Sequence, residues 1–288
     1  MKAEIKNICV VGAGNMGHQI ALQAALSGFN TYCTDVNETT LGKARDFANN
    51  YLADRVKKGK MTQEAADATA ANIHFTTSLE EAAANADMVI EAIVELIEVK
   101  RDLFARLDKI CPPHAIFGTN SSYIVSSRIA DATSRPDKVL NIHFFNPALV
   151  MKLVEVVKGP HVSDETVETV FEVSRKLGKT PVLIKKEIYG FVVNRIFSAL
   201  TKEACYLLDQ DVASIEDIDI AVKNGLGHPM GPFELLDLTG IDLEYDVLTA
   251  KYRNTGALED KPSPAIVARY AKGRFGRKTG AGFYDYNK

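Results

Sequence analysis

One glycine-rich turn constrains the fold of this chain more than any other feature of its sequence. The run Gly-Ala-Gly-Asn-Met-Gly at 12–17 follows the short apolar run Ile8–Val11 and precedes an apolar-periodic stretch that ends at Gly28. A second strand-like run, Thr31–Thr34, leads to Asp35. A strand, a glycine turn, a helix, a second strand and an acid in this order predict the first unit of a dinucleotide-binding sheet.

Each of the three glycines in this turn is required for a different steric reason. Gly12 allows the tight turn, Gly14 lets the backbone approach a pyrophosphate, and Gly17 lets the helix pack closely on the strand. The free N–H groups at the start of the helix attract phosphates. Asp35 can accept hydrogen bonds from ribose hydroxyls and would repel a 2′-phosphate, so we expect NAD rather than NADP. The alternative is a glycine-rich turn that binds nothing.

The same alternation of strand and helix continues through the first half of the chain. Met88–Ile90 is a buried type of strand that leads to Glu91, Ala115–Phe117 is the next, and Lys138–Phe145 carries His143 near its end. Repeated units of this kind predict an α/β fold with a doubly wound, mostly parallel sheet. Ligands bind outside the carboxyl ends of such strands, so Glu91 is predicted to lie near the cofactor, although alone it would be an ordinary strand-end acid.

Reactive side chains gather between residues 120 and 155. Glu155 interrupts an apolar run, and a carboxylate in such a run needs a partner. The imidazole of His143 is a suitable one, and a histidine oriented by a carboxylate is the minimal set for general-base chemistry near neutral pH. Ser121 and Ser122 follow a strand end and are predicted to face the same crevice.

The alternatives for these residues are structural. Asn120, Ser121 and Ser122 could cap a helix that starts near Ile124, because serine and asparagine are favoured N-caps. His143 taken alone could be a hydrogen-bonded histidine of the core.

The second half of the chain is predicted to be helical. Gly190 opens a long apolar-periodic segment that carries Asn194 near its start, and helix signals dominate from there onward. We place a domain boundary near 187, with a dinucleotide-binding domain at 1–187 and a helical domain at 188–288. The apolar helical domain indicates either a dimer interface or a packed monomeric core. Asn194 could equally be a core asparagine bonded to backbone.

Composition excludes several classes of protein. The 288 residues carry a net charge of −3, which argues against a large nucleic-acid surface. No apolar stretch reaches the roughly 18 residues that a membrane span requires. The four cysteines show no metal-ligand spacing and are expected to be buried free thiols, which fits a cytoplasmic protein.

Several motifs in order resemble the L-3-hydroxyacyl-CoA dehydrogenase family, most closely its bacterial 3-hydroxybutyryl-CoA members, over nearly the whole chain. They are Val-Gly-Ala-Gly-Asn-Met-Gly (11–17), Glu-Ala-Ile-Val-Glu (91–95), Thr-Asn-Ser-Ser (119–122), His-Phe-Phe-Asn-Pro (143–147), Met-Lys-Leu-Val-Glu-Val (151–156), Gly-Phe-Val-Val-Asn-Arg (190–195), Pro-Met-Gly-Pro-Phe-Glu-Leu-Leu-Asp (229–237) and Lys-Thr-Gly-Ala-Gly-Phe-Tyr (278–284).

The resemblance implies a reaction and a role for each site residue. His143 would be the general base and Glu155 its partner, while Ser122 and Asn194 would hydrogen-bond the reacting oxygen at C3 of an acyl-CoA substrate. Lys57 and Lys58 would meet the coenzyme A phosphates, and the helical domain would form a homodimer. NAD would lie against Gly12, Gly14, Asn15, Met16, Gly17, Asp35, Glu91, Asn120, Ser122, Asn146 and Lys278.

One departure from the family pattern lies at the domain junction. The family usually has a proline directly before the Gly-Phe of the second domain, whereas Ile188-Tyr189 precedes Gly190 in this chain. Two rival functions stay open: an NAD dehydrogenase of a free hydroxy acid without coenzyme A, and a non-catalytic NAD-binding protein. Without the resemblance, Lys57 and Lys58 would be ordinary solvent-exposed lysines at the end of a helix, where positive charge suits the helix dipole.

Overall fold

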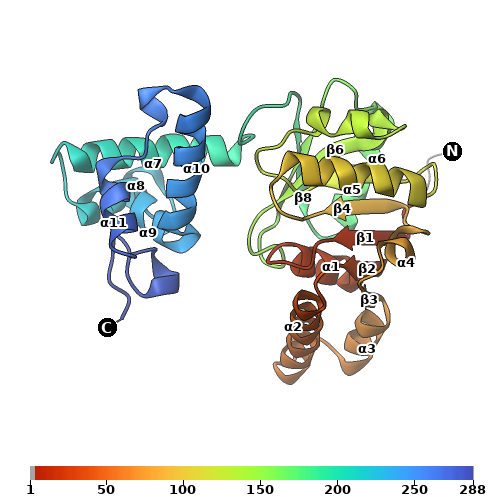
Figure 1. Cartoon of the computed structure of the whole chain (residues 1–288). Helices are drawn as coiled ribbons and strands as arrows, with labels where there is room; N and C mark the ends of the chain where they lie inside the picture. Colours follow the sequence, from red (N-terminus) through yellow and green to blue (C-terminus); the bar gives the residue numbers. More distant parts are fainter. Residues whose placement is uncertain (1–3, 288) are drawn as a thin grey trace. The chain divides into compact units, whose positions relative to one another are not determined.

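The computed structural model describes residues 4–287, except for the side chain of Asn254. The chain divides between Phe191 and Val192 into two compact units, whereas the sequence placed the boundary at 187. The first unit is an α/β sheet structure and the second is helical, which confirms the predicted fold class. Figure 1 shows the elements of both units with their labels.

The first unit is built on one eight-stranded sheet with the strand order β3-β2-β1-β4-β5-β6-β7-β8. All neighbouring strands are parallel except β6 and β7, which are antiparallel. The strands are β1 (Asn7–Val11), β2 (Asn30–Thr34), β3 (Ile73–Thr76), β4 (Met88–Glu91), β5 (Ile116–Thr119), β6 (Val139–Phe144), β7 (Leu153–Val157) and β8 (Thr180–Ile184).

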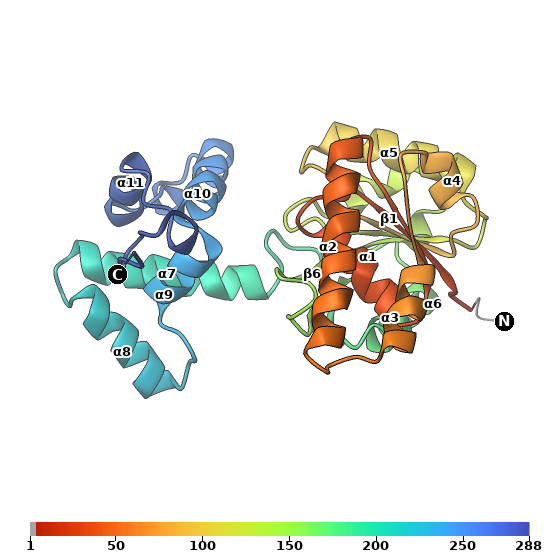
Figure 2. The same ribbon diagram turned by 90° about the horizontal axis from the view of Figure 1, so that it is seen from below.

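Helices cover both faces of this sheet, as Figure 2 shows from below. The helices are α1 (Gly17–Leu26), α2 (Glu38–Lys57), α3 (Gln63–Ala71), α4 (Leu79–Ala83), α5 (Ile97–Ile110) and α6 (Asp164–Lys176). Because side chains alternate along a strand, Ile8 and Val10 of β1 pack into one core with α1, α2 and α6. Cys9 and Val11 pack into a second core with α4 and α5.

The reversal between β6 and β7 matters most for the site. The two strands pair in a register that sets His143 directly opposite Glu155, with Ile142 opposite Val156. Residues directly opposite in an antiparallel pair have neighbouring side chains on the same face. The peptide bond between Asn146 and Pro147, in the connection between these strands, is cis. The chain therefore returns between β6 and β7 within residues 145–152.

In the second unit, the described residues 192–287 form five α-helices that pack around a core of their own. Buried side chains come from every helix, including Cys205, Phe233, Leu236, Ile241 and Ile266. The helices are α7 (Val193–Asp209), α8 (Ile215–Leu226), α9 (Pro232–Thr239), α10 (Ile241–Thr255) and α11 (Pro264–Ala271).

Two buried carboxylates fix the C-terminal segment onto these helices. Asp237 accepts hydrogen bonds from the backbone N–H groups of Phe283 (2.8 Å) and Tyr284 (2.9 Å). Asp219 accepts one from the Tyr284 hydroxyl at 2.8 Å. The segment that carries Lys278 is thereby tied to α8 and α9.

All four cysteines are free and buried, as predicted. Burial is the largest cause that raises the pKa of the Cys9 thiol well above its usual value, and it raises that of Cys33 to about 12. Such thiols are protonated small hydrophobes near neutral pH. Among residues 4–287, no helix is long and apolar enough to cross a membrane.

Candidate active site

The glycine turn lies at the carboxyl end of β1 and leaves open space above its backbone. Gly12 has a φ of +99°, and a Cβ there would lie 2.5 Å from the carbonyl oxygen of Ala92. A Cβ on Gly17 would lie 1.7 Å from the carbonyl oxygen of Gly12. At Gly14, by contrast, a Cβ would meet nothing within 4 Å. The first and third glycines are required by packing, whereas the second leaves room for a group from outside.

The surroundings of this space fit the phosphates and ribose of NAD. No side chain caps the N-terminus of α1, which begins at Gly17 after Met16, so an anion can approach the positive end of this helix. Asp35 accepts hydrogen bonds from the N–H groups of Ala13 (2.8 Å) and Asn37 (2.9 Å). Each carboxylate oxygen has a further lone pair, so Asp35 can still accept bonds from hydroxyls. Asn15 is exposed at the mouth of the turn.

The predicted pairing of His143 with Glu155 is present. Nδ1 of His143 lies 2.8 Å from Oε2 of Glu155, and Nε2 lies 3.0 Å from Oγ of Ser122. The side chain of Glu155 has no exposed surface and that of His143 is 5% exposed. Because an ionised carboxylate only accepts, the contact assigns the proton to Nδ1 and leaves Nε2 of the neutral ring as an acceptor.

Aromatic rings enclose this imidazole. The ring of Phe145 lies edge-on at 4.7 Å between centroids, and that of Phe191 lies at 5.5 Å. Phe191 is completely buried and has a φ of +47°, which an L-residue rarely adopts. The apolar enclosure limits water around His143 and strengthens its electrostatic interaction with Glu155.

The polar residues of the loop after β5 have two different kinds of partner: some bind backbone N–H groups, and one contacts His143. Oγ of Ser121 accepts a hydrogen bond from the N–H of Ile124 at 2.8 Å, as in a cap, and Oδ1 of Asn120 accepts one from the N–H of Phe144 at 2.8 Å. The segment continues into a short 3-10 turn at Ser126–Arg128, so the alternative of a helix starting near Ile124 is wrong. The hydroxyl of Ser122 lies at hydrogen-bond distance from the His143 ring.

Glu91 does not offer its carboxylate to a ligand. The residue has no exposed surface, and its Oε1 accepts bonds from the Lys100 ammonium at 2.6 Å and the N–H of Ile93 at 2.7 Å. Its Oε2 accepts the hydroxyl of Thr119 at 2.6 Å. The sequence correctly placed Glu91 at the end of a strand. However, Lys100 of α5, Thr119 of the neighbouring strand and the N–H of Ile93 occupy both of its carboxylate oxygens. A direct contact between this side chain and NAD does not fit that arrangement.

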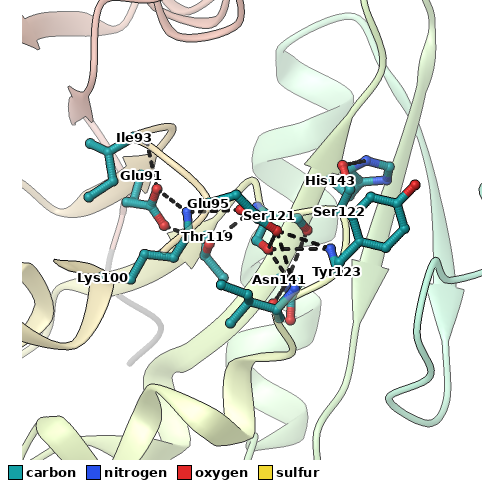
Figure 3. A network of polar contacts seen from close by, with 11 residues as sticks. Glu91, Ile93, Glu95, Lys100, Thr119, Ser121, Ser122, Tyr123, Asn141 and His143 are labelled. Carbon is teal, nitrogen blue, oxygen red and sulfur yellow. Dashed lines mark hydrogen bonds and ion pairs between the residues drawn. The ribbon is translucent and has the colours of Figure 1, made fainter. Parts of the chain in front are cut away.

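Lys100, Glu95 and Thr119 were missed as parts of this site. Figure 3 shows them as one network with Glu91 and the loop of Ser121. A signal for Lys100 existed in the sequence, because Lys100, Phe104 and Leu107 follow the i, i+4, i+7 spacing of one helix face. A lysine on the apolar face of a helix requires a buried acceptor, and Glu91 supplies it.

The other predicted residues lie apart from this cluster or in the second unit. Asn146 is exposed after β6, and Lys57 and Lys58 are exposed at the end of α2, where Lys58 pairs with Asp54 at 2.8 Å. In the second unit, Asn194 is half-buried in the first turn of α7, and Lys278 donates to Asp242 at 2.5 Å. The roles assigned to these residues stay predictions.

The unusual junction places an aromatic residue beside the site loop. The ring of Tyr189 lies 4.6 Å from that of Tyr123, the residue that follows Ser122. Gly190 next to it has a φ of +74°. The residue that replaces the usual proline therefore packs on the loop after β5.

A glycine turn open to a dinucleotide, with a buried imidazole–carboxylate pair at the same edge of the sheet, characterises the nicotinamide-dependent dehydrogenases. The protein is such an enzyme, and its cofactor is NAD. More particularly, the chain belongs to the 3-hydroxyacyl-CoA dehydrogenase family. Residues 7–188 match the family's NAD-binding domain and residues 190–286 match its C-terminal domain.

Individual relatives cover the whole chain. It is 40% identical to a probable 3-hydroxybutyryl-CoA dehydrogenase of Bacillus subtilis, with 99% of both chains covered. It is also 40% identical to the mitochondrial hydroxyacyl-coenzyme A dehydrogenase of Homo sapiens, over 99% of this chain and 92% of the human one. The solved structure of the (S)-3-hydroxybutyryl-CoA dehydrogenase of Ralstonia eutropha has a TM-score of 0.90 and 36% identity, covering 99% of this chain and all of that one.

Proposed function

We propose that this dehydrogenase interconverts short-chain (S)-3-hydroxyacyl-CoA and 3-ketoacyl-CoA, with 3-hydroxybutyryl-CoA and acetoacetyl-CoA as the preferred pair. The observation that carries the proposal is the position of His143 between Glu155 and Ser122 at a strand end of the cofactor unit. The relatives named 3-hydroxybutyryl-CoA dehydrogenases support this substrate class.

The arrangement accounts for the movement of one proton. In the oxidative direction Nε2 of His143 accepts the proton of the 3-hydroxyl, and Glu155 stabilises the imidazolium that forms. In the reductive direction the same nitrogen returns the proton to the carbonyl oxygen. NAD, when bound, supplies the hydride chemistry at C3.

Ser122 orients the reacting oxygen in this scheme. Its hydroxyl lies at hydrogen-bond distance from Nε2, so an oxygen that meets the imidazole also comes within reach of the hydroxyl. A donor directed at a carbonyl oxygen stabilises the charge that develops there during reduction. Asn194 stays a prediction for the same oxygen.

Recognition of coenzyme A is assigned to Lys57 and Lys58. Both are exposed at the C-terminal end of α2, and Lys58 has a nearby acid in Asp54. Phosphates are strong acceptors of charge-assisted bonds, and such an exposed contact is sensitive to salt. The two lysines would therefore affect KM for the thioester more than kcat.

The substrate is tested by following NADH oxidation with acetoacetyl-CoA and with free acetoacetate. We expect the thioester to react with a kcat/KM at least roughly 100-fold above that of the free acid, because binding energy from the remote coenzyme A lowers the barrier at C3. The double variant Lys57→Ala/Lys58→Ala is expected to raise KM for the thioester and to leave the free acid unaffected.

Each outcome of this assay has a clear meaning. If the wild-type enzyme reduces the free acid with the same kcat/KM as the thioester, it is a dehydrogenase of hydroxy acids, and the coenzyme A assignment is wrong. An enzyme that binds NADH but turns over neither compound would contradict the proposed reaction and favour a protein that binds NAD without catalysis.

Dimer formation through the helical unit is also proposed. Large apolar side chains of this unit are at least half exposed: Ile196, Tyr206, Val212, Ile220, Leu226, Leu243 and Leu258. A second copy of the chain that covers these side chains would remove their apolar surface from water, which favours association. We expect light scattering after size exclusion to give twice the mass of one chain, and Ile196→Asp to shift the enzyme toward the monomer. A wild-type mass of one chain would refute the dimer.

A further inference from the structure

The last residues of the first unit are attached to the loop after β5 by a carboxylate. Glu187 lies three residues beyond the end of β8. Its Oε1 accepts the hydroxyl of Ser126 at 2.8 Å and the N–H of Ser127 at 2.8 Å. Ser126 has no exposed surface, and its own N–H donates to Oδ1 of Asn141 at 2.8 Å. The segment after β8 is therefore tied to the same loop that carries Ser122.

The space around this carboxylate is closely filled. A Cβ on Gly159, which follows β7, would lie 2.8 Å from Oε1 of Glu187 and 2.5 Å from Cε1 of His161. The ring of His161 is itself fixed, because its Nε2 lies 2.9 Å from the carbonyl oxygen of Val139. Glycine at position 159 thus leaves room for the Glu187 carboxylate, and two donors and these neighbours hold the carboxylate in one place.

The residues that follow Glu187 bring two aromatic rings to the site. The ring of Tyr189 lies 4.6 Å from that of Tyr123 in the loop after β5. Phe191 is completely buried, packs with apolar side chains of β7 and β8, and has its ring 5.5 Å from that of His143. Its φ of +47° is strained for an L-residue and persists only where surrounding contacts fix the backbone. The bonds of Glu187 are such contacts.

We propose that Glu187 is a positioning residue of the dehydrogenase: its carboxylate ties residues 188–191 to the loop after β5 and thereby holds the ring of Phe191 against His143. The role rests on the proposed function, in which His143 moves the proton of the reacting hydroxyl. A ring held there excludes water from the imidazole and keeps its interaction with Glu155 strong. Without the anchor, the strained backbone at Phe191 would relax and open this side of the imidazole to water.

The kinetics of two variants at position 187 test this role. Glu187→Ala removes the acceptor of both bonds, so we expect kcat for acetoacetyl-CoA reduction to fall about 10-fold through the misplaced ring. KM for NADH should be unchanged, because the glycine turn is not touched. Glu187→Gln keeps an acceptor oxygen at the same distance along the side chain and should retain at least about half of the wild-type kcat. A wild-type kcat in Glu187→Ala, or a glutamine variant as slow as the alanine variant, would overturn the role.

The matched control is Glu81→Ala. Glu81 also accepts a hydroxyl, that of Thr76 at 2.6 Å, but it lies in α4 beside β3, at the other edge of the sheet from β8. Removing this carboxylate should leave kcat as in the wild type. A loss equal to that of Glu187→Ala would show a general effect of losing such a bond and would contradict positioning.

A double-mutant cycle identifies the residue through which Glu187 acts. Phe191→Leu keeps an apolar side chain but removes the ring, and we expect it to lower kcat about 10-fold. Glu187→Ala should then have little further effect in the Phe191→Leu background, because coupled residues are non-additive. Equal losses in both backgrounds would show that Glu187 acts independently of Phe191, and the proposed route would be wrong.

A measurement without substrate tests the proposal independently of the reaction. In enzyme with isotope-labelled histidine, the NMR signal of the His143 ring is assigned by its loss in His143→Ala, and the nearby Phe191 ring shifts it. We expect Glu187→Ala to move this signal, and Glu187→Gln and Glu81→Ala to leave it in place. If the wild type does not reduce acetoacetyl-CoA but the signal moves as expected, the proposed function fails and the positioning of Phe191 stands. A signal that stays in place in Glu187→Ala would overturn the proposal.

Discussion

Replacing His143 by alanine is expected to lower kcat for acetoacetyl-CoA reduction by roughly 100- to 10,000-fold, the range that a positioned acid–base group contributes. The variant removes Nε2, which carries the proton, and leaves the Glu155 carboxylate without its imidazole inside an apolar enclosure. Binding of NADH should change little, because the cofactor's phosphates are assigned to the turn after β1. Steady-state kinetics and an NADH fluorescence titration measure the two effects separately.

The matched control is His114→Ala. His114 also pairs with a carboxylate, Asp87, at 2.8 Å, but the ring is 45% exposed and Asp87 lies at the amino end of β4. Removing the same chemical group at the opposite edge of the sheet should leave kcat close to that of the wild type. A His143→Ala variant with more than about one-tenth of the wild-type kcat would contradict the proposed mechanism.

Local patterns were sufficient to predict the glycine turn and the central strands of the sheet that position the cofactor site. The glycine turn, the acid after β2 and the apolar runs of β1, β4, β5 and β6 each carry short-range signals of their own. The short elements β3, α3 and α4 and the helix α6 were not assigned from the sequence. Helix α6 begins at a capping serine, Ser163, and has an amphipathic pattern, so a signal for it was present.

The pairing of His143 with Glu155 was predictable for a different reason. Glu155 interrupts an apolar run and so requires a polar partner, and His143 lies close enough in the chain to supply one. The register that sets the two side chains opposite each other is tertiary information. A slip of one residue would have turned Glu155 to the other face of the sheet, and the sequence alone does not exclude that slip.

The hydrogen bonds of Glu91 with Lys100 and Thr119 could not be predicted from the local sequence pattern. Glu91 ends a strand whether it faces a ligand or a lysine, and nothing within β4 distinguishes the two. The choice is made by α5, which directs Lys100 at the carboxylate, and by Thr119 of the neighbouring strand. These contacts join residues 9 and 28 positions apart in the chain. They follow from the packing of a helix on a sheet, which the pattern of one segment does not contain.

The second large effect is expected at Gly17. Gly17→Ala would put a Cβ 1.7 Å from the carbonyl oxygen of Gly12, so either the turn or the start of α1 must move. Overpacking against backbone is expected to cost about 3 kcal/mol or more of folding stability. Displacing the helix N-terminus should also weaken NADH binding by roughly 100-fold, since the phosphates lose its N–H groups. Denaturant unfolding and NADH titration measure the two losses.

Gly14→Ala separates cofactor binding from folding. Its Cβ would meet nothing within 4 Å, so the free enzyme should unfold as the wild type does while the added methyl group occupies the space assigned to the pyrophosphate and weakens NADH binding. Gly42→Ala, inside α2 and equally free of contacts, is the control and should leave NADH binding intact. If Gly14→Ala binds NADH as tightly as the wild type, the pyrophosphate does not approach Gly14. The loss at Gly17 would then reflect folding alone.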